Sequence, residues 1–323
     1  MNVEKIPLVS VLIITYNHEQ YIGQALESVL SQETNFPIEV WVGDDASTDS
    51  TVQIIEQYCK QEPSKIRGVF RDKNIGASAN LYDLLQRVRT PYIAFLEGDD
   101  YWLDHEKLQK QYSFLQNHLQ YVGCTHECEF VDENSEKLIL KPLEWISRKR
   151  EFSMKVSKGF YLSGQMGTLF CRNIFADTGG RYEIIKTAHP IISDRTLQMV
   201  LTLEGNLYRL PDVMSAYRRI SHGQGKNATS ECFTKNTHSA YDNFMITCNL
   251  ERYAREYTGI HNLDFSYTKK MFFTSAVYQW LCRRIPDLFN DIVKILRTEQ
   301  GQMWRYFLFL PRGICHKLIQ KFR

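Results

Sequence analysis

Three acidic side chains stand within four residues at the end of an apolar run. The run covers residues 92–96, and the acids Glu97, Asp99 and Asp100 follow it directly. A short apolar run of this kind is typical of a buried strand, and open α/β sheets bind ligands at the carboxyl ends of their strands. Carboxylates this close repel one another unless a cation joins them, and Mg²⁺ or Mn²⁺ prefers oxygen ligands. The trio therefore predicts a divalent metal site; the alternative is a polar turn in which Asp100 caps a helix.

Polar residues also end the other strand-like runs of the N-terminal part. The first run ends in Thr15, Tyr16 and Asn17, and the second leads into the acid-rich segment 43–49. A buried Asp45 carboxylate can accept the imide N–H of uracil or thymine, a bond that cytosine and adenine do not offer in that geometry. The alternative is a helix N-cap, and both readings hold if Asp49 or Ser50 makes the cap while Asp45 binds.

Strands and helices alternate through the first 118 residues and place these side chains together. We expect strands at 9–15, 38–43, 66–70 and 92–96, and helices at 21–31, 50–60, 77–88 and 104–118. Alternation with short connections predicts an α/β fold with a doubly wound, mostly parallel sheet flanked by helices. The polar strand ends then share one edge of the sheet.

The alternation breaks after residue 120. We expect strands at 121–131, 168–171 and 207–210, and helices at 194–203, 241–257, 267–282 and 286–297. Residues 132–165 are polar and predict a long loop or mobile flap.

Composition excludes several classes of protein. The 323 residues are 43% hydrophobic and 24% charged, as in ordinary globular proteins, and the net charge of +2 gives no field for a nucleic-acid partner. No signal peptide or membrane-spanning run is recognised, so the cytoplasm is the expected location. Cys124, His126 and Cys128 fall on one face of a predicted strand without a fourth ligand, and we interpret them as packing residues. The dinucleotide and P-loop glycine patterns are absent, which argues against NAD enzymes and ordinary NTPases.

Four segments, taken together, resemble glycosyltransferase family 2. They are Val-Ser-Val-Leu-Ile-Ile-Thr-Tyr-Asn at 9–17, Leu-Glu-Ser-Val-Leu-Ser-Gln at 26–32, Asp-Asp-Ala-Ser-Thr-Asp at 44–49 and Glu-Gly-Asp-Asp-Tyr-Trp at 97–102. The resemblance implies a GT-A fold over residues 1–228, divided into a nucleotide-sugar-binding half (1–118) and an acceptor half (119–228). A helical C-terminal extension (229–323) would follow. The implied enzyme is an inverting, metal-dependent hexosyltransferase that uses Mn²⁺ or Mg²⁺ in cell-surface polysaccharide biosynthesis. Its donor would be a nucleotide-diphosphate sugar, expected to be a UDP-sugar, and its acceptor a saccharide or lipid-linked saccharide.

The resemblance assigns donor contacts by position. Thr15, Tyr16 and Asn17 fall where the family frames the base and ribose, and Asp45 falls where an aspartate reads the base. The family often places an arginine after the Asn-x-Gly turn, but residues 77–80 read Ala-Ser-Ala-Asn. A phosphate contact from that segment is therefore unsupported.

The resemblance also implies the metal ligands and the base. Asp99 falls at the metal-binding aspartate of the D-x-D motif, with Asp100 beside it, and Glu97 stands where an aspartate is usual, as a donor contact. Asp194, at the start of a predicted helix, is the candidate catalytic base; the alternative is that it only favours a helix N-terminus. His222, after a Tyr-Arg pair, is a candidate ligand of the metal or contact of the diphosphate. Closure of the loop near residues 141–165 would exclude water from the reaction.

Residues 301–323 form a basic amphipathic tail. The segment contains five arginines and lysines and no acid. Such a helix either lies on an anionic membrane, which would make the protein peripheral on the inner face of the plasma membrane, or docks on the core.

Two other functions stay open. A nucleotidyltransferase would need a glycine-rich basic loop after the first strand, which is absent, and a non-catalytic sugar-nucleotide or membrane-binding module would not need the candidate base.

Overall fold

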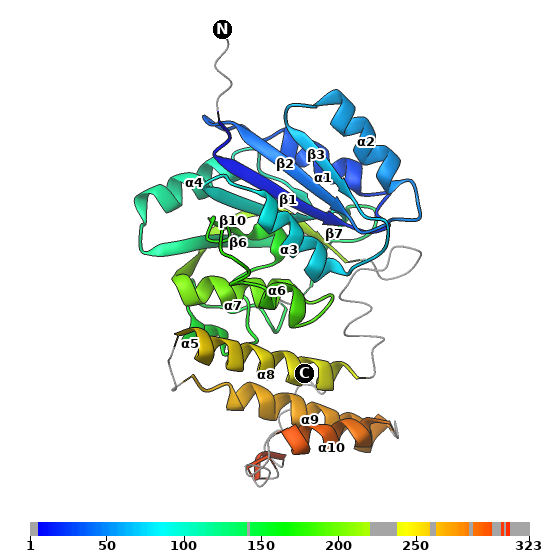
Figure 1. Ribbon diagram of the computed structural model, residues 1–323, viewed down its shortest axis with the longest axis vertical. Coiled ribbons are helices and arrows are strands. Elements are labelled where there is room, and N and C mark those ends of the chain that lie inside the picture. The colour runs from blue at the N-terminus through cyan, green and yellow to red at the C-terminus, as the bar shows by residue number, and fades with distance from the viewer. Residues whose placement is uncertain are drawn as a thin grey trace. The chain divides into compact units, whose positions relative to one another are not determined.

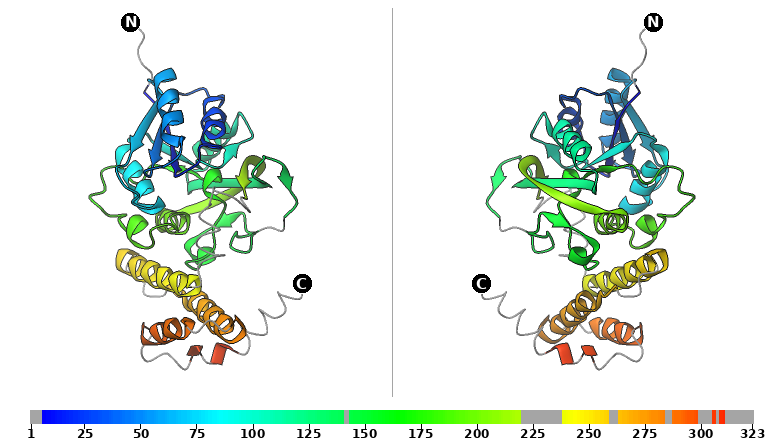
Figure 2. Two further views of the ribbon diagram at one scale, coloured as in Figure 1. Left: turned by 90° about the vertical axis from the view of Figure 1, so that its right-hand side faces the viewer. Right: turned by 90° about the vertical axis from the view of Figure 1, so that its left-hand side faces the viewer.

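The computed structural model describes residues 6–140, 143–219, 238–258, 263–283, 287–298, 305–306 and 308–310. The chain divides into two compact units. The first comprises Met1–Ser157 with Tyr161–Asn227, and the second comprises Lys158–Phe160 with Ala228–Arg323. Figures 1 and 2 show a sheet with flanking helices in the first unit and packed helices in the second.

A single mixed sheet organises the first unit. Within the described residues it has ten strands, in the order β3-β2-β1-β4-β9-β6-β10-β5, with β7 paired to β6 and β8 to β10. The strands are β1 (Val9–Thr15), β2 (Ile38–Asp44), β3 (Ile66–Phe70), β4 (Tyr92–Glu97), β5 (Tyr101–Trp102), β6 (Tyr121–Val131), β7 (Lys137–Leu138), β8 (Glu151–Phe152), β9 (Phe170–Arg172) and β10 (Asn206–Arg218). β1 pairs in parallel with β2 and β4, β2 with β3, and β6 with β10. The short β9 runs antiparallel between β4 and β6 and joins the two parallel blocks. The predicted doubly wound, mostly parallel α/β fold is confirmed.

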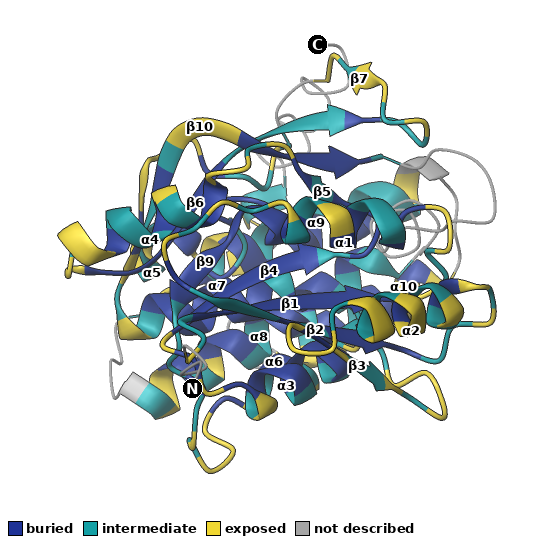
Figure 3. Cartoon of the chain, turned by 90° about the horizontal axis from the view of Figure 1, so that it is seen from above, coloured by how far each residue is buried: buried dark blue, intermediate teal, exposed yellow. Residues whose placement is uncertain are grey.

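Helices cover both faces of the parallel block. They are α1 (Ile22–Leu30), α2 (Thr51–Gln61), α3 (Ala77–Arg87), α4 (Lys107–Asn117), α5 (Met154–Ser157), α6 (Ile184–Thr187) and α7 (Asp194–Glu204), with a 3₁₀ turn η1 (Met166–Thr168). Side chains alternate across a strand, so β1 sends Val9, Val11 and Ile13 into one core with α1, α2 and α4. α3 packs against β1 and β2 on the other face. Figure 3 shows β1 and β4 buried along their length, whereas α2 exposes its outer face.

The structure differs from the sequence expectation within residues 119–228. The strand expected at 207–210 extends through β10 to Arg218, and its pairing with β6 shifts register between Arg209 and Val213. Pro211 and Asp212 occupy that irregular stretch, so the β pattern is interrupted although the strand resumes. The segment expected as a loop at 132–165 contains β7, β8 and α5.

The second unit is a set of three described helices, α8 (Ser239–Thr258), α9 (Ser266–Arg283) and α10 (Leu288–Thr298). Phe244, Phe273 and Ile295 lie in their shared core. A buried ion pair joins Lys269 Nζ to Glu251 at 2.7 Å. In the described part of the chain, no helix is both long enough and apolar enough to cross a membrane. Most of the predicted basic tail, residues 311–323 included, lies outside the described residues.

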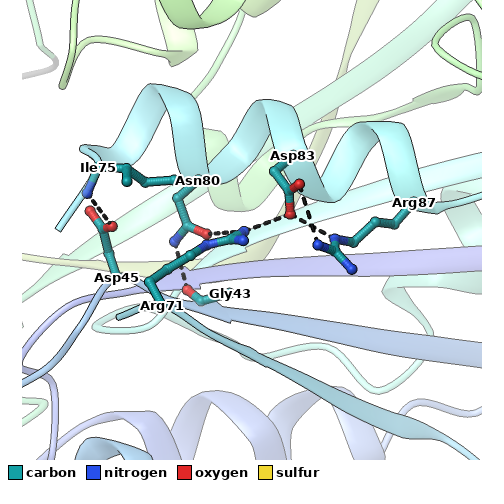
Figure 4. Close-up of polar contacts among 7 residues, drawn as sticks. All are labelled: Gly43, Asp45, Arg71, Ile75, Asn80, Asp83 and Arg87. Carbon is teal, nitrogen blue, oxygen red and sulfur yellow. Dashed lines mark hydrogen bonds and ion pairs between the residues drawn. The ribbon is translucent and has the colours of Figure 1, made fainter. Parts of the chain in front are cut away.

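Asn80 ties α3 to the sheet. Its Nδ2 donates to the Gly43 carbonyl at 2.7 Å, and its Oδ1 accepts from Arg71 at 3.1 Å. Arg71 continues to Asp83, 2.7 Å away, which also pairs with Arg87 (Figure 4). Gly43 has no Cβ, and one added there would collide with the Asn80 carboxamide. The glycine therefore allows the helix to approach the end of β2.

Replacing Asn80 with alanine should lower the free energy of unfolding by about 2 kcal/mol, because two hydrogen bonds of about 1 kcal/mol each are lost. Urea unfolding followed by circular dichroism measures this. Asn117→Ala, an exposed asparagine at the end of α4, is the matched control and should change the free energy by less than about 0.5 kcal/mol. Equal losses in the two variants would contradict the role of Asn80.

Candidate active site

The acidic trio forms a tight turn at the carboxyl edge of the sheet. Glu97 ends β4, and the Gly98 N–H donates to the Ile14 carbonyl of β1 at 2.9 Å. The Asp100 N–H donates back to the Glu97 carbonyl at 3.0 Å. A Cβ at Gly98 would lie 2.5 Å from Thr15 Oγ1, so only glycine lets the turn pack this closely on the end of β1.

A buried arginine holds the main chain of this turn. The Arg218 backbone N–H donates to Asp100 Oδ1 at 2.8 Å, and its Nε donates to the Asp99 carbonyl at 2.8 Å. Its terminal nitrogens donate to Gln24 Oε1 at 2.7 Å and to the Asp132 carbonyl at 2.9 Å. The residue is 1% exposed. Arg218 thus fixes the backbone of the turn while its guanidinium bonds the carbonyl of Asp99, and the resemblance pointed to it only through the Tyr-Arg pair.

The residues after the turn anchor it from the other side. β5 pairs antiparallel with the end of β10, where Tyr101 faces Ala216 and Trp102 faces Ser215. Trp102 Nε1 donates to the Gly167 carbonyl of η1 at 3.0 Å. The Lys107 ammonium lies 3.9 Å from the centre of the Trp102 ring. The aromatic residues of the motif are therefore structural supports of the acids.

Three carboxyl groups of the site, those of Glu97, Asp100 and Asp194, have raised pKa values. Burial, followed by the charges of Asp99 and Asp194, raises the pKa of Glu97 to about 8. Burial and the charges of Asp99 and Glu97 raise the pKa of Asp100 well above its usual range, against the opposing effect of Arg218. Burial also raises the pKa of Asp194, although its Oδ1 accepts the Arg195 N–H at 2.6 Å. The charge of Asp194, the first residue of α7, thus contributes to the raised pKa of Glu97, and its role as the catalytic base stays a prediction.

The loop after β1 connects the site to the loop after β2. Asn17 has a positive φ of 56°, its Oδ1 accepts the Thr48 N–H at 2.7 Å, and its own N–H donates to Ser47 Oγ at 2.9 Å. Tyr16, which directly precedes Asn17, keeps 43% of its surface exposed. Asn17 thus holds the two loops together, while Tyr16 is accessible to a ligand.

His18 joins this loop to the acidic turn and was not assigned a role from sequence. Its Nδ1 lies 3.2 Å from Thr15 Oγ1, and its Nε2 lies 4.0 Å from Asp99 Oδ2. The only sequence signal for it is its position directly after Asn17. When protonated, the imidazole would compensate part of the charge on Asp99.

Asp45 is buried at the start of the loop after β2, and its carboxylate binds protein. Oδ1 accepts the Ile75 N–H at 2.7 Å and Oδ2 accepts the Gly76 N–H at 2.9 Å, as Figure 4 shows for Ile75. Each carboxylate oxygen has a second acceptor site, so base reading by Asp45 stays a prediction. The helix cap expected in this segment comes from Asp49, whose Oδ1 accepts the Thr51 N–H at 3.0 Å, and Ser50 makes no side-chain cap bond.

The donor set at the turn suits a divalent cation that is shared with a ligand. Across the described residues, no three or more His, Cys, Asp or Glu side chains form a group that would hold a metal ion by themselves. Mg²⁺ commonly takes one or two carboxylates and completes its shell with substrate phosphates and water. The neighbouring acids Glu97, Asp99 and Asp100 could supply these one or two carboxylates. His222, the other predicted ligand, lies outside the described residues.

Comparison with known proteins identifies the family. The glycosyl transferase family 2 model matches residues 10–178, and the chain belongs to this family. An uncharacterised protein of Mycobacterium tuberculosis is 35% identical over 215 residues, which is 66% of this chain and 59% of that protein. The chain thus spans about three fifths of the length of that relative. TuaG of Bacillus subtilis, whose assignment as a teichuronic acid biosynthesis glycosyltransferase is provisional, is 39% identical over 34% of this chain and 42% of its own.

The fold is also found among solved structures. TarS of S. aureus, residues 1–349 in complex with UDP, superposes with a TM-score of 0.53 at 18% sequence identity. The match covers 84% of this chain and 71% of that one. It shows the GT-A type of fold expected from the sequence.

Replacing Arg218 with lysine should destabilise the protein by about 3 kcal/mol, because the acids of the turn stay buried while the guanidinium bonds to main-chain and side-chain oxygens are lost. Thermal and urea unfolding measure the effect. Arg219→Lys, at the next position, is the control and should shift stability by less than about 1 kcal/mol. A tolerated Arg218→Lys change would show that the turn does not depend on this residue.

Stability of the metal-free protein should fall as pH rises. The raised pKa of Glu97, about 8 against 4.5 for the unfolded chain, means that its stabilising contribution is complete below pH 4.5 and is lost as pH rises through 8. We expect the melting temperature to fall between about pH 5 and about pH 8.5, and added Mn²⁺ to reverse the loss by neutralising the acids. Glu97→Gln should flatten the profile, and the exposed-site control Glu136→Gln should not. A profile that rises with pH would refute the assignment.

Proposed function

We propose that the protein is a metal-dependent, inverting glycosyltransferase. It moves a sugar from a nucleotide-diphosphate donor, a UDP-sugar, to a saccharide or lipid-linked saccharide in cell-surface polysaccharide biosynthesis. The observation that carries the proposal is the buried acidic turn 97–100 at the carboxyl edge of the sheet, where the charge of Asp194 contributes to the raised pKa of Glu97, in a chain of glycosyl transferase family 2.

The donor nucleoside would bind between the loops after β1 and β2. The Tyr16 ring is accessible for stacking on a base, and Thr15 and Asn17 border the same space. Asp45, the first residue after β2, keeps acceptor capacity for an imide N–H. The UDP in the TarS structure supports a uridine donor by likeness of fold.

Asp99 and Asp100 would hold the metal, Mn²⁺ or Mg²⁺, with His222 as a further proposed ligand. When bound, the ion supplies positive charge that neutralises the departing nucleoside diphosphate. Glu97 would contact the donor beside it. Arg218 holds the turn through its bonds to Asp100 and to the Asp99 carbonyl. The carboxylates would then bind the metal and the diphosphate without rearrangement of the backbone.

Asp194 would act as the general base. An acceptor hydroxyl is a poor nucleophile at neutral pH, and a carboxylate whose pKa is raised by burial accepts its proton more readily than an ordinary aspartate. Attack from the face of the sugar opposite the leaving diphosphate inverts the anomeric carbon. The N-terminus of α7 fixes this carboxylate through the Arg195 N–H.

The acceptor proposal rests on relatives. TuaG's provisional role in teichuronic acid synthesis supports a cell-surface polymer, and a lipid-linked acceptor would suit a protein at the cytoplasmic face of the membrane. The basic residues 301–323 would then contact anionic lipid.

A donor-hydrolysis screen tests the proposal. The purified protein with Mn²⁺ or Mg²⁺ is offered UDP-N-acetylglucosamine, UDP-glucose, UDP-galactose, GDP-mannose and dTDP-rhamnose, and released nucleoside diphosphate is measured. We expect one donor to be hydrolysed and release to stop with a chelator. Asp99→Asn and Asp194→Asn should each lower the rate by about 100-fold or more, and the exposed Asp177→Asn should not. Release that is indifferent to both site variants would refute the proposal.

A further inference from the structure

The loop before α3 lies between the donor side of the site and the segment that carries Asp194. The two oxygens of Asp45 accept the N–H groups of Ile75 (Figure 4) and Gly76, so the residue after β2 fixes the start of α3. Asn74 Oδ1 also accepts the Gly76 N–H, at 3.1 Å. Gly76 is therefore held in one position by the chain on the donor side.

Gly76 contacts Pro190 directly. Its φ of 87° belongs to the region that favours glycine, and a Cβ there would lie 2.6 Å from the Pro190 carbonyl oxygen. That same carbonyl accepts the Ser78 N–H of the first turn of α3 at 3.0 Å. The start of α3 can thus bind the Pro190 carbonyl only because residue 76 has no side chain.

A rigid turn connects Pro190 to Asp194. His189 Nδ1 accepts the N–H groups of Ile191 and Ile192, both at 3.1 Å. The Ser193 N–H donates to the Ile191 carbonyl at 3.0 Å, and α7 begins at the next residue. Because these bonds tie residues 191–193 to His189 and to one another, we expect a displacement of Pro190 to move Asp194 as well.

We propose that Gly76, held by Asp45, is a positioning residue that sets the location of Asp194 through the Pro190 carbonyl. The inference rests on the proposed function, in which Asp194 is the base. It gives Asp45 a second role. The same carboxylate would then bind the nucleobase of the donor and set the position of Asp194, the general base. Misplacement of a catalytic group by about 1 Å costs up to about 100-fold in rate.

The matched pair Gly76→Ala and Gly180→Ala tests this. Gly180 has a φ of 85°, as strained for alanine as the 87° of Gly76, but nothing lies within 4 Å of an added Cβ there. Both variants should therefore lose melting temperature, while only Gly76→Ala should lose turnover. With the panel donor that the wild type hydrolyses fastest, we expect Gly76→Ala to lower kcat about 10- to 100-fold with donor KM within about twofold.

A double variant separates positioning from general damage. In an Asp194→Asn background, Gly76→Ala should lower kcat no further, because the group that it misplaces is already gone. If Gly76→Ala does not fold, His189→Ala should lower kcat and His189→Asn, whose Oδ1 replaces the accepting nitrogen, should restore it.

The outcomes are distinguishable. Equal kcat for Gly76→Ala and Gly180→Ala, or additive losses with Asp194→Asn, would overturn the positioning role while leaving the proposed function intact. A wild type that turns over none of the five donors, or an Asp194→Asn variant with full activity, would overturn the proposed function and the positioning role with it.

Discussion

The site depends on the buried guanidinium of Arg218, which bonds to the main chain of a turn that carries three acids. Its donors meet the main chain of Asp99 and the side chain of Gln24, and its own backbone N–H meets the Asp100 carboxylate. A buried arginine is costly unless its donors are satisfied, and here they are directed at oxygens from several elements. The end of β10, the start of α1 and the acidic turn are thereby held in one arrangement.

One arginine does not balance the three acids of the turn. The pKa values of Glu97 and Asp100 are raised by burial and by neighbouring acids, although Arg218 opposes the shift at Asp100. A protein that only needed a stable turn would not gain from this cost. Acids with strongly raised pKa values are typical of functional sites.

Close backbone approaches, each allowed by a glycine, assemble the rest of the site. Gly98 lets the turn rest on Thr15, Gly43 admits Asn80, and Gly76 admits the Pro190 carbonyl. Segments that lie far apart in sequence therefore pack directly on the main chain of a glycine, with no side chain between them. The functional groups are placed by the scaffold more than by their own bonds to one another.

The sequence by itself determined the parallel strands β1 to β4, the helices α1 to α4 that follow them and the edge where the acids lie, because apolar periodicity and short connections leave few other topologies. It did not show that β10 continues beyond Pro211 to Arg218, since a local pattern does not reveal pairing with β6. Tertiary structure alone gave Arg218 its buried partners, placed His18 beside Asp99, and engaged Asp45 with the loop at 75–76. Those roles depend on contacts between residues remote in sequence, and residue type and spacing do not encode such distances.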